Sequence, residues 1–250
     1  MKKTTSLIKI KKCNLEFKIP FRNKKLKVLN DISVNVQKGE FLVFLGPSGS
    51  GKSTLLRIMS GIEKSYTGEV VYDKSVTPKD MSFIFQQSAL FPWLTVFQNI
   101  ALGLTARGET ESIIRKKVIA VATDLGLEKF VHSFPHELSG GMKQRVGIAR
   151  ALVTQPKIIF MDEPFSGLDS FTATELRKEL LRIWEEKNMT IVLVTHLASE
   201  AVEMGDRIAV VSSRPATIEK IIINPLLRPR KNRTKPFYAL EDEIVSLVKP

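Results

Sequence analysis

A glycine-rich segment in the first quarter of the chain carries a lysine and a hydroxyl side chain at a fixed spacing. Residues 46–53 read GPSGSGKS and fit the pattern G-x-x-x-x-G-K-[ST]. The apolar run 41–45 before them predicts a buried parallel strand, and the apolar pattern after them predicts a helix. Glycines let successive N–H groups point inward, the helix start adds unpaired donors, Lys52 can reach phosphates and Ser53 can ligate Mg²⁺. The segment predicts a phosphate-binding loop, and its flanks disfavour the alternative of an ordinary glycine-rich turn.

A pair of carboxylates follows a second apolar run. Asp162 and Glu163 come directly after residues 158–161, which read as another buried strand. An Asp at such a strand end can hold Mg²⁺ through its water shell, and Glu163 can polarise a water molecule against a phosphate. A solvated acidic pair is the alternative, which the upstream loop makes the weaker one.

A second helix start has the features of an anion site. Residues 138–145 read LSGGMKQR, in which Ser139 is a good N-cap and Gly140 and Gly141 leave the first amides uncovered. The helix is expected to run to about residue 153. By itself this could be an ordinary capped helix. Two phosphate-seeking helix starts in a chain with one nucleotide suggest that the second serves a neighbouring subunit's nucleotide.

Together these segments resemble the ATP-binding subunit of an ABC transporter, over nearly the whole chain. Residues 46–54 resemble the Walker A loop, 160–164 the Walker B segment and 139–142 the family signature, where Met142 replaces the more usual Gln. Gln86, with Gln87 beside it as a competitor, resembles the Q-loop glutamine. Residues 166–169 resemble the D-loop, with Gly167 where Ala is more usual. His196, after the apolar run 191–194, resembles the switch histidine, whereas His132 and His136 read as ordinary loop residues.

The resemblance implies how these residues act. ATP is expected between the Walker A loop of one subunit and the signature of a second copy, so the partner is a homodimer. The resemblance makes Glu163 the general base and Asp169 a contact across the dimer, while His196 contacts the γ-phosphate and steadies the base. The ATP-binding residues are Gly46, Pro47, Ser48, Gly49, Ser50, Gly51, Lys52, Ser53 and Thr54; Ser53, Gln86 and Asp162 complete the Mg²⁺ shell; and Ser139, Gly140, Gly141 and Met142 contact ATP in trans.

An aromatic ring is expected to stack on the adenine. Residues 8–11 alternate as in a strand, and Phe17 lies where the family usually places this ring. Phe21 competes for the role because the following loop is slightly long. A core position for Phe17 is the other alternative.

The predicted fold class is α/β: a P-loop NTPase of the ABC type, with an antiparallel β subdomain, a mainly parallel core sheet and an inserted helical subdomain. Residues 1–87 and 156–225 would form the catalytic core with its N-terminal β subdomain, 88–155 the helical subdomain with the signature, and 226–250 a C-terminal extension. Apolar positions in 112–127 and 172–184 predict helices, the second with a possible capping box from Thr172 to Glu175, and 241–248 predicts a short terminal helix.

Composition limits the classes of protein that fit. No apolar run approaches the roughly 20 residues that span a membrane, and lysines interrupt any secretory signal. The single cysteine, Cys13, excludes an internal disulfide and favours a reducing compartment. The net charge is +12: residues 2–27 hold ten Lys and Arg against Glu16, and 214–235 hold seven against Glu219. Such charge suits an anionic membrane surface, nucleic acid or simply solvated edges, and no nucleic-acid motif supports the second reading.

The loop after Gln86 and Gln87 points to a branch of the family. Residues 88–96 are apolar, aromatic and stiffened by Pro92, which suits a socket for a partner helix, although a local core cluster is equally open. With SRP at 213–215 and LRPR at 227–230, the loop resembles the nitrate, sulfonate and taurine group of bacterial importers. The resemblance implies transmembrane permease subunits, indirectly a solute-binding protein, and a peripheral place on the cytoplasmic side of the bacterial inner membrane. An exporter or lipid-handling ATPase is the main alternative; a nucleic-acid-acting ABC-type ATPase or a single-subunit P-loop kinase or GTPase fits less well.

Overall fold

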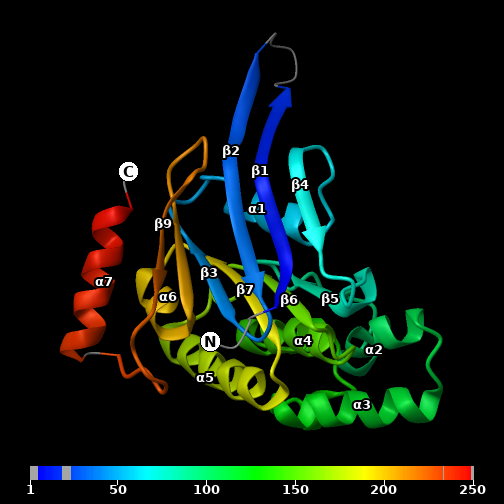
Figure 1. Ribbon diagram of the computed structural model, residues 1–250. Helices are drawn as coiled ribbons and strands as arrows, with labels where there is room; N and C mark the ends of the chain where they lie inside the picture. Colours follow the sequence, from blue (N-terminus) through cyan, green and yellow to red (C-terminus); the bar gives the residue numbers. More distant parts are fainter. Residues whose placement is uncertain (1–4, 19–23, 233, 249–250) are drawn as a thin grey trace.

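The computed structural model describes residues 5–18, 24–232 and 234–248, and Phe21 lies outside them. A three-stranded antiparallel sheet in the order β2-β1-β4 forms the N-terminal part (Figure 1). In β1, Ile8 and Ile10 are buried while Lys9 and Lys11 are exposed, the alternation of a sheet with one wet face. The strands are β1 (Ser6–Lys18), β2 (Lys25–Gln37) and β4 (Thr67–Tyr72).

A six-stranded sheet in the order β5-β6-β7-β3-β8-β9 forms the core. Every neighbouring pair is parallel except β8 and β9, which are antiparallel. The three central strands are buried along their whole length, as their unbroken apolar runs predict. The strands are β3 (Phe41–Leu45), β5 (Met81–Ile84), β6 (Ile158–Asp162), β7 (Thr190–Thr195), β8 (Arg207–Val211) and β9 (Ile218–Ile223). The mainly parallel core sheet and the separate antiparallel sheet confirm the predicted fold class.

Seven α-helices are present in the described residues, and the three between 88 and 155 lie together in the lower right of Figure 1. Short 3-10 turns occupy Pro78–Asp80, Glu128–Phe130 and Pro135–Glu137. None of the helices in the described parts of the chain is long and apolar enough to cross a membrane. The helices are α1 (Lys52–Met59), α2 (Val96–Ala106), α3 (Glu111–Asp124), α4 (Gly140–Leu152), α5 (Ser170–Lys187), α6 (Ala198–Met204) and α7 (Lys235–Leu247).

Two helix starts differ from the sequence prediction. Helix α5 begins at Ser170, and its N-cap is Asp169, whose carboxylate accepts hydrogen bonds from the amides of Phe171 and Thr172. The capping box expected from Thr172 to Glu175 was therefore wrong, because an earlier Asp satisfies the free amides first. Helix α7 begins at Lys235, six residues before the expected start, and Pro236 sits in its first turn, where a missing N–H costs nothing.

The core sheet separates two hydrophobic clusters. Strand β3 shows how: Phe41, Val43 and Leu45 face the cluster that includes the helices α2 to α6, while Leu42 and Phe44 face the cluster under the antiparallel sheet. Side chains alternate across a strand, so one apolar run supplies both clusters. Both faces of the core sheet are therefore covered, and the candidate site lies at the ends of its strands.

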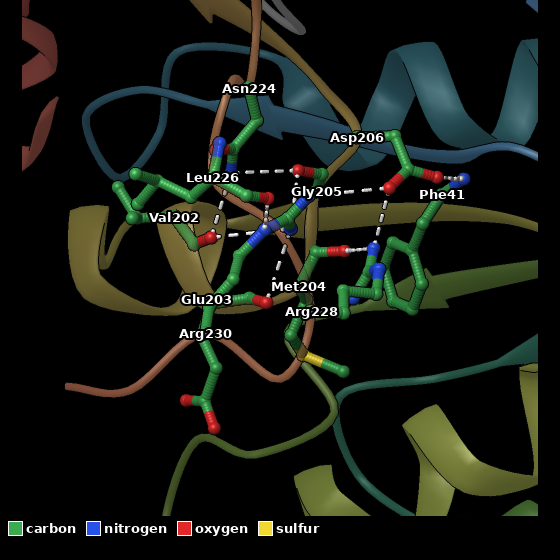
Figure 2. Close-up of polar contacts among 10 residues, drawn as sticks. All are labelled: Phe41, Val202, Glu203, Met204, Gly205, Asp206, Asn224, Leu226, Arg228 and Arg230. Carbon is green, nitrogen blue, oxygen red and sulfur yellow. Dashed lines mark hydrogen bonds and ion pairs between the residues drawn. The ribbon is translucent and has the colours of Figure 1, made fainter. Parts of the chain in front are cut away.

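Two arginines in the segment after β9, Arg228 and Arg230, form hydrogen bonds at the end of α6 (Figure 2). The Arg230 side chain is only 3% exposed and donates to main-chain carbonyls at the end of α6, while Arg228 donates to the Met204 carbonyl and pairs with Asp206 at 2.7 Å. The Arg228 guanidinium also lies 4.4 Å from the Trp184 ring centroid. Burial lowers the pKa of Arg230 to about 10, so it remains charged at neutral pH. The unpaired carbonyls at the end of α6 thus receive charged donors, which gives the two arginines of the LRPR motif a structural role.

Candidate functional site

The glycine loop between β3 and α1 has the backbone that a phosphate-binding loop needs. Gly49 and Gly51 have φ of 74° and 119°, in the region that favours glycine. A Cβ on Gly46 would lie 2.4 Å from the Val211 carbonyl oxygen, so a side chain there would push the loop off the sheet. The predicted strand, loop and helix are all present, which brings the free amides of the α1 N-terminus to the end of β3.

Lys52 folds back into this loop. Its Nζ donates to the carbonyls of Gly46 at 2.9 Å and Pro47 at 2.7 Å, and the residue is 3% exposed. Burial lowers the pKa of Lys52, and the nearby charges of Glu163 and Asp162 oppose that shift. This buried ammonium is hydrogen-bonded to neutral carbonyls and, among the described residues, lacks an anionic partner in direct contact, which a bound phosphate would supply.

A second donor in the loop has no partner. Ser50 is 2% exposed, and among the described residues its hydroxyl makes no hydrogen bond. An unpaired buried hydroxyl costs free energy, so its presence beside Lys52 fits a loop built to receive an external acceptor. Ser48 is exposed, and Pro47, Ser53 and Thr54 are half-buried around the same turn. The residues present therefore fit a nucleotide's phosphate groups.

The Ser53 hydroxyl donates to the Asp162 carboxylate at 2.6 Å, which joins the start of α1 to the end of β6. Burial raises the pKa of Asp162, and the Ser53 hydrogen bond opposes it. No cluster of three His, Cys, Asp or Glu side chains able to hold a metal occurs in the described ranges. One hydroxyl and one carboxylate are what Mg²⁺ uses when phosphates and water fill its other positions. The pair thus fits the expected Mg²⁺ site.

Glu163 and His196 face each other across neighbouring strand ends. The His196 Nδ1 lies 3.0 Å from Glu163 Oε2. Strands β6 and β7 pair in register at Asp162 and Val194, and the Glu163 amide donates to the Val194 carbonyl at 3.0 Å, so the residues that follow both strands meet. Glu163 has φ of 45°, a left-handed conformation that is uncommon for a residue with a Cβ. Residues 33 positions apart are brought together as the sequence reading expected.

Gln86 and Gln87 are both exposed and follow β5, the strand beside β6. No hydrogen bond among the described residues joins Gln86 to Ser53 or Asp162, so its expected place in the Mg²⁺ shell stays a prediction. The loop after the two glutamines is held by Arg150 of α4, which donates to the carbonyls of Ser88 at 2.7 Å and Ala89 at 2.9 Å. These two hydrogen bonds link the signature helix directly to the loop.

The signature lies on the surface. The Ser139 hydroxyl accepts from the Met142 amide at 3.3 Å, which confirms the predicted N-cap of α4. Ser139 and Gly140 are exposed, and a Cβ on Gly140 would meet nothing within 4 Å. Among the described residues, no hydrogen bond links 139–142 to the glycine loop. The two helix starts predicted to bind anions are therefore not linked by hydrogen bonds in the described part of the chain.

Asp169 and Phe17 stand at exposed positions. Asp169 caps α5, and the Thr172 hydroxyl, followed by the Thr172 and Phe171 amides, lowers the pKa of its carboxyl. Phe17, near the end of β1, is 42% exposed, which disfavours the alternative of a core position. Its expected stacking on adenine stays a prediction.

One residue at this site was not foreseen. The Arg214 guanidinium donates to the Gly49 carbonyl in the glycine loop, from the turn that follows β8. The SRP motif was visible in the sequence, but its contact spans 165 positions and only the fold reveals it.

Known proteins share both the sequence and this architecture. The sequence profile described as ABC transporter matches residues 29–166. The chain belongs to the ABC transporter family. The aliphatic sulfonates import ATP-binding protein SsuB of Bacillus subtilis is 42% identical over 226 residues, which cover 89% of this chain and 88% of that protein. The uncharacterized ABC transporter ATP-binding protein MJ0412 of Methanocaldococcus jannaschii is 41% identical and covers 97% and 92%.

A solved ABC cassette carries the same fold. The ATP-binding cassette MJ0796, a dimer in a post-hydrolysis state bound to ADP and Pi, is 32% identical with a TM-score of 0.77, covering 88% of this chain and all of that one. These matches confirm the ABC transporter resemblance and the ABC ATPase fold. The chain is an ATP-binding ATPase of this family.

Proposed function

We propose that the chain is the ATP-hydrolysing subunit of an ABC importer for a small polar solute, of the nitrate, sulfonate or taurine kind, and that it acts as a homodimer around two ATP molecules. The observation that carries the dimer is the split site. One end of the core sheet carries the residues proposed to act on the phosphates: Lys52, Ser53, Asp162, Glu163 and His196. The signature is exposed elsewhere on the same chain. A second copy, turned about a twofold axis, supplies each loop with the other's signature.

The residues divide the reaction between them. The amides of 46–51 and Lys52 bind the phosphate chain, and Phe17 stacks on the adenine. Ser53, Asp162 and Gln86 would hold Mg²⁺, which would supply positive charge to neutralise the phosphates. Glu163 accepts a proton from water as its oxygen attacks the γ-phosphorus, and the bond to the ADP oxygen breaks. His196 orients the Glu163 carboxylate, and the partner's signature completes the clamp on the γ-phosphate.

The loop 88–96 is the proposed contact with the permease. Trp93 is 69% exposed and Phe91 is 43% exposed, their ring centroids 5.4 Å apart. The fully buried Asn99 holds the loop through hydrogen bonds to Phe91, Leu94 and Thr95. An apolar ring pair on a stiffened loop suits a partner helix, because little ordering entropy is lost on docking. Docking here would place the chain peripherally on the cytoplasmic side of the bacterial inner membrane.

The import direction and solute class rest on relatives. Several proteins about 40% identical to this chain are named aliphatic sulfonates import ATP-binding proteins, and the aligned regions cover most of both chains. The proposed solute is bound by other subunits. Sequence similarity of this chain to importer ATPases therefore supports a chemical class of solute and not a particular compound.

The decisive experiment uses the complex. The chain is purified with its native permease in lipid vesicles, and ATP hydrolysis is measured with the cognate binding protein and taurine, an alkanesulfonate, nitrate or no solute. We expect one solute to stimulate hydrolysis several-fold, and the Lys52→Ala complex to hydrolyse no ATP under any condition. Export of a lipid from the vesicles, or stimulation by lipid alone, would overturn the importer proposal.

A further inference from the structure

Three charged side chains are buried between α5 and α6, outside the nucleotide site. The side chains of Arg177, Glu200 and Glu203 are only 11%, 6% and 9% exposed. The Arg177 Nε donates to Glu203 at 2.7 Å, and its Nη1 lies 3.5 Å from Glu200. Figure 1 shows the two helices on the same side of the core sheet. One guanidinium thus serves two carboxylates in the interior.

Such a cluster is not explained by stability. Buried ion pairs often add little, because removing charges from water costs as much as their attraction returns. Here burial raises the pKa of Glu200, with Thr195 and Arg177 opposing the shift. Apolar side chains could hold α5 and α6 together equally well. Stability alone therefore does not explain why charged side chains are buried here.

The cluster reaches the switch histidine through Thr195. The Thr195 hydroxyl donates to the Glu200 carboxylate at 2.6 Å and accepts from the Leu197 amide at 3.1 Å. Thr195 and Leu197 are the neighbours of His196 in the chain, so this one hydroxyl ties both sides of the histidine to Glu200. Thr195 is 2% exposed, which shields these hydrogen bonds from water.

The cluster also reaches the segment beyond the catalytic glutamate. The Arg177 guanidinium lies 5.8 Å from the ring centroid of Phe165. Phe165 is buried and lies between Glu163 and Asp169 in the sequence. Arg177 stands on α5, the helix that Asp169 caps. Arg177 therefore contacts the chain on the glutamate side and, through Glu200 and Thr195, on the histidine side.

We propose that Arg177, Glu200 and Thr195 are positioning residues that set the geometry of the Glu163–His196 pair and connect it to the helix begun by Asp169. The inference rests on the proposed roles of Glu163 and His196 in hydrolysis. The pair stands at 3.0 Å across two strand ends, and a displacement of about 1 Å in such a site can lower a rate about 100-fold. A movement of Asp169 on contact with a partner would reach His196 along this route.

The first test isolates one hydrogen bond. Thr195→Val keeps the shape but removes the hydroxyl, and Thr195→Ser keeps the hydroxyl. With the full chain and Mg²⁺-ATP, we expect Thr195→Val to lower kcat at least tenfold with KM within twofold, and Thr195→Ser to restore most of kcat. Hydrogen exchange should show faster exchange of the Leu197 amide in Thr195→Val alone. Equal kcat in both variants would overturn the proposal.

The second test separates positioning from stability. Arg177→Met is compared with Arg207→Met, which breaks an ion pair to Glu40 of similar burial at the opposite end of β3. We expect both to lower the melting temperature, but only Arg177→Met to lower kcat at unchanged KM. If both retain kcat while Glu163→Gln and His196→Ala are inactive, the positioning role fails and the proposed function stands. If Glu163→Gln is fully active, the proposed function itself fails.

Discussion

At the scale of single residues, the site contains several groups whose burial or backbone conformation lowers the stability of the folded chain. Lys52 is buried on neutral carbonyls, Ser50 carries an unpaired hydroxyl, and Asp162 is a buried carboxylate. Glu163 has a left-handed backbone. All four features cost stability, and the first three suit phosphate or metal binding, so a variant that removes one of them should be more stable than the native protein.

Asp162→Asn tests whether a residue suited to metal binding lowers the stability of the protein. Burial raises the folded-state pKa of Asp162, so the ionised form opposes folding above that pKa, and the penalty disappears as pH falls below the unfolded value. Asn retains an oxygen for the Ser53 hydroxyl. We expect the variant to gain about 1 kcal/mol in free energy of unfolding at pH 8 and to lose Mg²⁺-dependent hydrolysis. Urea unfolding at pH 8 and pH 4 should show the gain shrinking at the lower pH. A variant less stable than the native protein at pH 8 would contradict the argument.

At the scale of elements, helix N-termini organise the site. Helix α1 faces the nucleotide loop, α4 presents the signature and α5 begins at Asp169. The two signature glycines differ in what surrounds them. A Cβ on Gly140 meets open space, whereas one on Gly141 would lie 2.5 Å from Thr172 Cγ2 at the start of α5. Gly141 therefore lets α4 and α5 approach closely, and Gly140 leaves the helix end uncovered.

Alanine substitutions should separate these two roles. Gly140→Ala should keep the melting temperature, because the methyl group has room, but lower ATPase activity about tenfold by covering amides that face the partner's nucleotide. Gly141→Ala should cost about 1–2 kcal/mol of stability by overpacking. The double variant Gly141→Ala/Thr172→Ser removes the clashing methyl, keeps the hydroxyl and should recover that stability. Thermal denaturation and ATPase assays measure both effects, and a fully active Gly140→Ala would contradict the proposed trans contact.

The features that the sequence predicted correctly at this scale are those formed by residues close together in the chain. The glycine loop, the acidic strand end and the Ser139 cap are local patterns, so reading along the chain found them. The contacts of Arg177, Arg214 and Arg230 join positions far apart in sequence, and no local pattern announces which carbonyl or carboxylate an arginine will meet. The predicted start of α5 was wrong for a local reason, because Asp169 and Thr172 are both good N-cap residues and the earlier one caps the helix.

At the scale of the whole molecule, a single chain exposes surfaces that a symmetric dimer would bury. The exposed residues include Ser139 and Gly140 of the signature, Asp169, and Ser48 in the glycine loop. Half-sites of this kind bind tightly only when the second copy brings the missing donors, so nucleotide affinity and association are linked. Hydrolysis followed by loss of the free phosphate would remove the group that both copies hold and so release the pair.

Blocking hydrolysis should therefore trap the dimer. Glu163→Gln removes the proposed base and keeps the side-chain size, so Mg²⁺-ATP should hold two copies together through both signatures. Gel filtration with light scattering should report a dimer with ATP and a monomer with ADP or without nucleotide. Glu163→Gln/Ser139→Arg is the matched control, because it retains the glycine loop but places a bulky cation where the partner's phosphate would dock, and it should stay monomeric. A monomer of Glu163→Gln at saturating ATP and micromolar protein would show that the exposed signature does not complete a neighbour's site.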